Sequence, residues 1–285
     1  MCRWAVRKGA LVFLFTAWIC PGPVFGGEGR LSLVGMGPGD PDLATVRALG
    51  RVREADIVYT LSPDLLERFE AEFEGKEVRN LSGSGVTRHH ARSDSGDALA
   101  GKASAPTAGE KTRGGLVREV KRALGEGKKI VFVDSGDPLI YGPWVWLLGE
   151  FGDSGMEVVP GVSSFNAGLA ALRRDPTWSP ETHTIILTTD RARSGDRLEE
   201  LAAHRCSLVL FTHKTEFPEM MRKLTTRYPA ATPVAVVFYA GYEGRESVVR
   251  GTLETIVPLM ADRDLPLEHI VFVGDFLDYR LEGER

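Results

Sequence analysis

The sequence predicts an α/β protein with two α/β domains, each built from buried strands that alternate with helices. The first observation is a repeated order of apolar run, Gly/Pro-rich loop and helix-forming run, as in residues 31–49. The second is a linker-like segment at residues 175–180, after which the alternation begins again. We therefore expect an N-terminal domain over residues 27–175 and a C-terminal domain over residues 182–285.

The composition is that of an ordinary globular protein and does not indicate nucleic-acid binding. The 285 residues are 43% hydrophobic and 26% charged, with a net charge of -4 and no dense basic run. If the first 26 residues are removed, Cys206 is the one cysteine left, so cysteine usage does not indicate a compartment.

Residues 1–26 have the layout of a secretory signal peptide. Basic residues precede an apolar run at residues 10–20, and Pro-Gly-Pro and small residues follow it. A membrane span needs about 20 apolar residues, so this run is short for one. We predict a cleaved signal and a periplasmic or secreted protein. If the segment is instead an uncleaved anchor or a misassigned start, the protein would be cytoplasmic. It would contact a membrane only through this segment, and only if the segment stays uncleaved.

The N-terminal domain is expected to contain five strands and five helices. The strands are predicted at residues 31–34, 56–59, 77–81, 129–134 and 156–159, and the helices at 43–49, 63–69, 116–124, 144–151 and 165–173. Residues 82–115 interrupt this pattern because Val86 and Leu99 are their only large aliphatic side chains. We expect a flexible insertion there.

The C-terminal domain shows the same alternation. Extended segments are predicted at residues 183–187, 207–211, 232–239, 246–251 and 269–274, and helices at 196–203, 216–228 and 252–260.

Three loops follow predicted strands of the first domain, at residues 35–42, 135–142 and 160–164. The carboxyl ends of parallel strands meet at one edge of a sheet, so we expect these loops to wall one cleft. Asp40 stands where a dinucleotide fingerprint requires glycine, and Pro38 has no N–H for a pyrophosphate. The first loop therefore favours a neutral or cationic ligand.

Taken together, these stretches resemble the tetrapyrrole (corrin/porphyrin) methylase family. The resemblance rests on five segments in the family's order, residues 34–43, 135–142, 159–164, 232–237 and 249–253. Members of this family are S-adenosylmethionine-dependent enzymes with two α/β domains. The resemblance implies C-methylation of a tetrapyrrole (a precorrin or porphyrinoid) or a related small molecule, with S-adenosyl-L-methionine in a cleft between the domains. It also implies a homodimer and no metal.

The resemblance further implies which residues contact the cofactor. They are Pro38, Ser135, Gly136, Asp137, Ile140, Ser163, Ser164, Thr212 and Ala240. Thr212 stands where the family commonly has methionine. The catalytic group is left open, and the candidates for proton transfer are Asp40, His213 and Tyr239. Trp144 and Trp146 either stack on a flat macrocycle or face the core.

A second function class stays open at this point. S-adenosylmethionine is made in the cytoplasm, so an exported protein would be separated from it. The alternative is an exported, non-catalytic protein that keeps the methylase fold and binds a tetrapyrrole or another small molecule. The export signal and Thr212 favour this alternative, whereas Gly136, Asp137 and Pro160 favour the enzyme.

Overall fold

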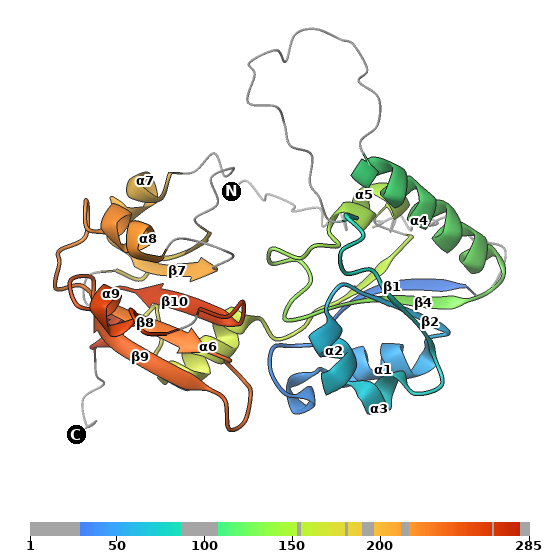
Figure 1. The fold of residues 1–285 in the computed structure, drawn as a ribbon, viewed down its shortest axis with the longest axis horizontal. Coiled ribbons are helices and arrows are strands. Elements are labelled where there is room, and N and C mark those ends of the chain that lie inside the picture. The colour runs from blue at the N-terminus through green and yellow to red at the C-terminus, as the bar shows by residue number, and fades with distance from the viewer. Residues whose placement is uncertain are drawn as a thin grey trace, which may run out of the picture.

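The computed structural model shows two sheets that lie side by side, each with its own helices (Figure 1). It describes residues 29–86, 108–152, 155–179, 182–189, 197–211, 217–263 and 265–279. The predicted signal segment and most of the predicted insertion lie outside these residues. Within them, no helix combines the length and the apolar character that crossing a membrane requires.

The first sheet is parallel throughout, with strand order β3-β2-β4-β1-β5. Its strands are β1 (Arg30–Gly35), β2 (Ile57–Thr60), β3 (Glu77–Asn80), β4 (Lys129–Asp134) and β5 (Glu157–Val159). The central strands β1, β4 and β2 are buried on both faces, which explains their nearly continuous apolar sequences.

Helices cover both faces of this sheet (Figure 1). One face carries α1 (Val46–Glu54), α2 (Pro63–Arg68) and α3 (Glu70–Phe73), and the other α4 (Ala108–Gly125) and α5 (Trp146–Phe151). The short η1 (Pro41–Leu43) lies in the loop after β1 and buries none of its residues. Two of these helices begin at capping side chains, because Thr45 accepts from the Ala48 N–H and Ser62 from the Leu65 N–H. The caps fix where the chain leaves the loops after β1 and β2.

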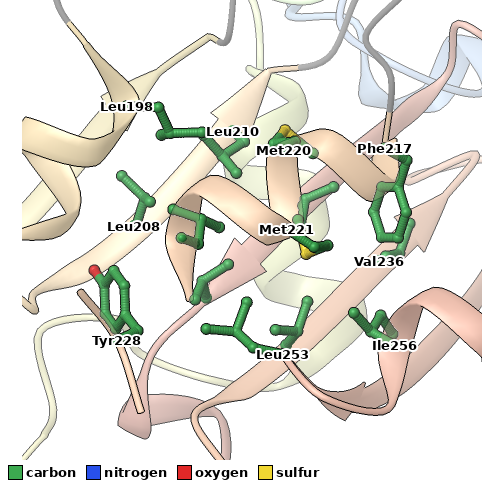
Figure 2. Packing of buried hydrophobic residues seen from close by; sticks show 14 of the residues in the cluster. Leu198, Leu208, Leu210, Phe217, Met220, Met221, Tyr228, Val236, Leu253 and Ile256 are labelled. Atoms are coloured by element: carbon green, nitrogen blue, oxygen red, sulfur yellow. The ribbon is translucent and has the colours of Figure 1, made fainter. Parts of the chain in front are cut away.

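The second sheet is mixed, with order β6-β7-β10-β8-β9, and only its β6–β7 pair is parallel. Its strands are β6 (Ile185–Thr188), β7 (Ser207–Phe211), β8 (Pro233–Phe238), β9 (Ser247–Thr252) and β10 (His269–Val273). One face packs against α7 (Leu198–Ala202), α8 (Phe217–Leu224) and α9 (Ile256–Leu259). Figure 2 shows this core, with Phe217, Met220 and Met221 of α8 near Val236 of the sheet.

The opposite face of the second sheet packs against α6 (Ser164–Leu172) and η2 (Asp275–Leu277). The sequence predicts α6 in the N-terminal domain, but its packing joins it to the second sheet. A Cβ on Gly168 would lie 2.7 Å from the Phe272 ring, so glycine is what lets α6 approach β10 this closely. The chain therefore passes to the second domain before α6, immediately after the loop that follows β5.

Three local predictions are corrected by the structure. The helix predicted to begin at residue 116 begins at Ala108, so its first turns fall within the predicted flexible insertion. Val86, also within that range, is fully buried in the first core, and Arg113 donates to its carbonyl. The helix predicted over residues 252–260 is confined to Ile256–Leu259, because β9 continues through Thr252.

Trp144 is a core residue. Its side chain is fully buried, its indole N–H donates to the Val133 carbonyl at 3.2 Å, and its ring meets Phe132 edge-on. The buried indole cannot stack on a ligand, so this possibility is removed for Trp144.

Candidate functional site: a cleft between the two sheets

The three glycine-containing loops of the first domain converge at the carboxyl ends of their strands. Gly37 forms an isolated bridge with Gly136, and its N–H donates to the Gly136 carbonyl at 3.3 Å. A Cβ on Gly161 would lie 2.1 Å from that same carbonyl oxygen, and one on Gly35 would lie 2.6 Å from it. The convergence predicted from the sequence is confirmed, and it depends on glycine because any side chain here would separate the loops.

A cavity of about 510 Å³ opens beside these loops and is walled by both domains. Its size lies within the range of small-molecule sites. The lining residues are Pro38, Gly39, Leu61, Ser62, Asp64, Val133, Asp134, Ser135, Gly136, Tyr141, Pro143, Ser164, Phe211, Val237, Ala240, Tyr242, Leu267, Glu268, His269 and Ile270. The walls that the structure describes thus combine glycine backbone that a ligand can approach closely, apolar side chains and a few polar groups.

The charges of the cavity favour a cation. Three carboxyl groups line it, from Asp64, Asp134 and Glu268, and none of the lining residues is a lysine or arginine. Asp64 is paired with Arg68 behind the wall and burial favours the protonated form of Asp134, so Glu268 is the carboxyl that carries most of the negative charge. Burial lowers the pKa of His269, against opposing effects of the Pro266 carbonyl and Glu268, so its imidazole is neutral at pH 7. A sulfonium compound with an apolar body fits these walls, whereas a pyrophosphate would meet like charge.

Five of the predicted cofactor residues line the cavity, namely Pro38, Ser135, Gly136, Ser164 and Ala240. Three others support the loops from behind. The Asp137 carboxylate accepts from the Leu139 N–H at 2.9 Å and so shapes the turn. Ser163 is buried and caps α6 through the Phe165 N–H, and Ile140 closes the Asp137 turn with its own N–H. Thr212 and His213 lie outside the described residues.

Asp40 and Tyr239 do not line the cavity. The Asp40 carboxylate accepts from the Glu243 N–H at 2.6 Å, and the Asp40 N–H donates to the Gly241 carbonyl at 2.9 Å. Both contacts join the first domain to the second, and they give Asp40 a structural role. Tyr239 adopts a left-handed backbone (φ 49°), and the Arg245 guanidinium stacks on its ring at 4.0 Å.

Asp134 is a site residue that the sequence analysis did not single out. It is the last residue of β4, and one carboxylate oxygen, Oδ1, accepts from the Ser135 N–H at 2.9 Å. Burial raises the pKa of this carboxyl to about 7; the Ser135 hydrogen bond opposes the rise and the nearby Asp137 charge adds to it. Its place at the strand end, directly before the second loop, is the sequence signal that could have found it.

An aromatic pair crosses the cleft. Tyr141 of the second loop and Phe211 at the end of β7 have ring centres 5.1 Å apart, and both line the cavity. Tyr141 has a left-handed backbone (φ 59°) and is 47% exposed. These rings give the cleft a partly exposed apolar surface that joins the two domains.

A profile of the family described as Tetrapyrrole (Corrin/Porphyrin) Methylases matches residues 30–257, which is most of the chain. The chain belongs to this family. It is thus an S-adenosylmethionine-dependent methyltransferase that acts on a tetrapyrrole, as the sequence analysis predicted.

Several curated relatives have similar lengths. The chain is 26% identical over 257 residues to the cobalt-precorrin-4 C(11)-methyltransferase of Methanocaldococcus jannaschii, covering 87% of this chain and 88% of that protein. It is 29% identical over 262 residues to the enzyme of the same name from Priestia megaterium, covering 87% and 89%. It is also 29% identical over 254 residues to the precorrin-4 C(11)-methyltransferase of Pseudomonas aeruginosa, covering 86% and 89%.

Solved structures of tetrapyrrole methylases share the fold. The cobalt precorrin-4 methyltransferase CbiF superposes with a TM-score of 0.69 at 28% identity, covering 90% of this chain and 99% of that one. The uroporphyrin-III C-methyltransferase of Thermus thermophilus, solved with S-adenosyl homocysteine, gives a TM-score of 0.62 at 22% identity, covering 88% and 99%. The two-domain α/β fold predicted from the sequence is therefore confirmed.

Proposed function

We propose that this chain methylates carbon 11 of a precorrin-4-type tetrapyrrole. The observation that carries the proposal is that three relatives matched over most of their length are named precorrin-4 or cobalt-precorrin-4 C(11)-methyltransferases. The acidic, backbone-lined cavity supports it, because such walls suit a sulfonium methyl donor. S-adenosylmethionine supplies the electrophilic methyl group when it is bound.

Residues of both domains would hold the donor in the cavity. The backbone of Pro38 and Gly136 forms the wall from the first-domain loops, Ala240 forms part of the wall from the second domain, and the Glu268 carboxylate would balance the positive charge. The enzyme's main contribution is then orientation, because holding the methyl group in line with the accepting carbon removes much of the entropic barrier. Phe211 and Tyr141 supply the apolar surface beside which a flat macrocycle would lie.

Asp134 is the group we assign to proton transfer. In the transfer, a π electron pair of the ring carbon would form the new C–CH3 bond, the donor sulfur would keep the pair of the broken S–CH3 bond, and the macrocycle would then lose one proton. A carboxyl with a pKa of about 7 is suited to accept that proton near neutral pH, and the Ser135 N–H leaves Oδ2 of Asp134 for this purpose.

The test uses the full-length chain with labelled S-adenosylmethionine and, separately, precorrin-4, cobalt-precorrin-4 and uroporphyrinogen III. We expect transfer of one labelled methyl to the precorrin-4 forms and none to uroporphyrinogen III, with NMR locating the methyl at carbon 11. Transfer to uroporphyrinogen III alone would refute the substrate. No heat of binding with millimolar S-adenosylmethionine would refute the enzyme and favour the non-catalytic alternative.

The compartment and the oligomeric state are further parts of the proposal. A signal peptide at residues 1–26 predicts that an alkaline phosphatase fused after this segment is active, which requires export; an inactive fusion would indicate a cytoplasmic enzyme or a misassigned start. The homodimer predicts twice the chain mass in light scattering, and a single chain mass would exclude it. Membrane association is expected only if residues 1–26 stay attached.

A further inference from the structure

Arg68, at the end of α2, lies behind the cavity wall with a side chain that is only 8% exposed. Its Nε donates to Oδ2 of Asp64 at 2.6 Å. One terminal nitrogen donates to the carbonyl of Gly39, and the other reaches Oγ of Ser135 at 3.4 Å. A single guanidinium thus ties together the loop after β1, the first turn of α2 and the loop after β4.

The same guanidinium also contacts the second domain. It lies 5.3 Å from the ring centre of Tyr242 and 5.4 Å from that of Phe69, which are cation–π distances. The Tyr242 hydroxyl donates to Oδ2 of Asp64 at 3.3 Å, the oxygen that Arg68 also binds. Burial raises the pKa of Tyr242 to about 12, so the hydroxyl keeps the proton that this contact needs.

Four of these partners, Gly39, Asp64, Ser135 and Tyr242, line the cavity, whereas Arg68 is not among its lining residues. We propose that Arg68 is a positioning residue that fixes the shape of the cofactor cleft by holding these four wall segments from behind. The proposal rests on the proposed function in that the cleft is taken to bind S-adenosylmethionine. Arginine suits this position better than lysine because its planar fork can donate in several fixed directions.

The two domains have other contacts that do not involve Arg68. Asp40 bonds to the backbone of Gly241 and Glu243, and Gly39 packs directly against Gly241. Replacing Arg68 is therefore expected to loosen the wall while the domains stay joined, so a folded variant should be obtained.

The test compares full-length Arg68→Met, which keeps the long apolar stem, with Arg68→Lys, which keeps the charge. The matched control is Arg53→Met, because Arg53 makes two hydrogen bonds to Glu72, at 2.8 and 2.7 Å, on the surface of the same domain. We expect calorimetry to show about tenfold weaker binding of S-adenosylmethionine for Arg68→Met. The loss for Arg68→Lys should be smaller, and the control should bind as the wild type does.

A second measurement needs no ligand. Hydrogen exchange should be at least about fivefold faster in residues 39–43 and 240–246 of Arg68→Met and Arg68→Lys than in the wild type, and unchanged in the control. Unchanged exchange in these segments overturns the positioning role, even if the wild type binds no S-adenosylmethionine and the proposed function falls. Faster exchange throughout the chain would also overturn it, because it would show a general loss of stability.

A double variant tests whether the effect passes through the domain contact. If Arg68 acts through Tyr242, the Arg68→Met/Tyr242→Leu variant should bind S-adenosylmethionine about as weakly as the weaker single variant. Effects that simply multiply would mean that Arg68 and Tyr242 act independently, which would refute the cross-domain part of the proposal.

Discussion

The pKa of Asp134 leads to a prediction about stability that does not depend on any ligand. Folding raises this pKa from an ordinary value of 3.8 to about 7. Between these two values the folded chain holds a proton that the unfolded chain has released, so stability falls as the pH rises through this range. Below about pH 3.8 the carboxyl is protonated in both states and costs the folded state nothing. The free energy of unfolding then falls as the pH rises, and it reaches its lower limit above about pH 7.

The magnitude follows from the size of the shift. Each pKa unit corresponds to about 1.4 kcal/mol, so a shift of this size sets an upper limit of about 4 kcal/mol on the cost of the buried charge. The carboxyl borders an open cleft, and water there reduces the cost. We expect roughly 1–3 kcal/mol at pH 8.5.

The Asp134→Asn variant removes the charge and keeps a side-chain oxygen for the Ser135 N–H. Urea unfolding should show the variant to be about 1–3 kcal/mol more stable than the wild type at pH 8.5, and most of this difference should vanish at pH 4.5. The control is Asp262→Asn, on the exposed turn after α9, which should show no such pH dependence.

The raised pKa of Asp134 would be refuted if the difference in unfolding free energy between Asp134→Asn and the wild type were the same at both pH values. It would mean that the carboxyl is solvated in the folded state, and the assignment of Asp134 as proton acceptor would lose its electrostatic basis. If the assignment is right, the same variant should lower kcat by about 10²-fold or more at pH 7.5, with little change in the Kd of S-adenosylmethionine.

Three further predictions concern the loops around the cleft. Asp137→Ala should weaken S-adenosylmethionine binding at least about tenfold in calorimetry, since the turn loses its bond to the Leu139 N–H; unchanged affinity would show that the turn holds its shape alone. Gly39→Ala should cost roughly 1–3 kcal/mol in urea unfolding, because φ is +71° and the new Cβ would lie 2.0 Å from the Gly241 oxygen; equal stability would contradict the domain contact. Deleting residues 87–107 should change Tm little, because buried Val86 and helix α4 are kept, and a large loss would show that the deleted segment is packed.

Local sequence patterns were sufficient for the order of the elements and for the glycine loops. The apolar runs at β1 and β4 are strands because both faces of a central parallel strand are buried. Gly35, Gly136 and Gly161 are adjacent because each lies at the end of a strand or two residues beyond it, at the same edge of one sheet. These features depend on neighbours in the chain and on general rules of sheet geometry.

Other features depend on contacts between distant segments. Local sequence patterns do not distinguish the roles of Asp40 and Asp134, since both are acids beside a glycine loop. The structure shows that Asp40 bonds to the backbone of Glu243, whereas Asp134 faces the cavity. Helix α6 is predicted in the wrong domain for a similar reason, because the sheet that it covers is shown by its packing, as of Gly168 on Phe272, and not by its own sequence.

The sequence by itself therefore determined the two α/β domains, the three converging loops and, through its motifs, the methylase family. Only the tertiary structure decided which acids face the cleft and how Arg68 links Gly39, Asp64, Ser135 and Tyr242. The physical reason is that strand and helix formation follow local periodicity. The burial of a carboxyl, or the partners of a guanidinium, are instead set by segments that the chain brings together only on folding.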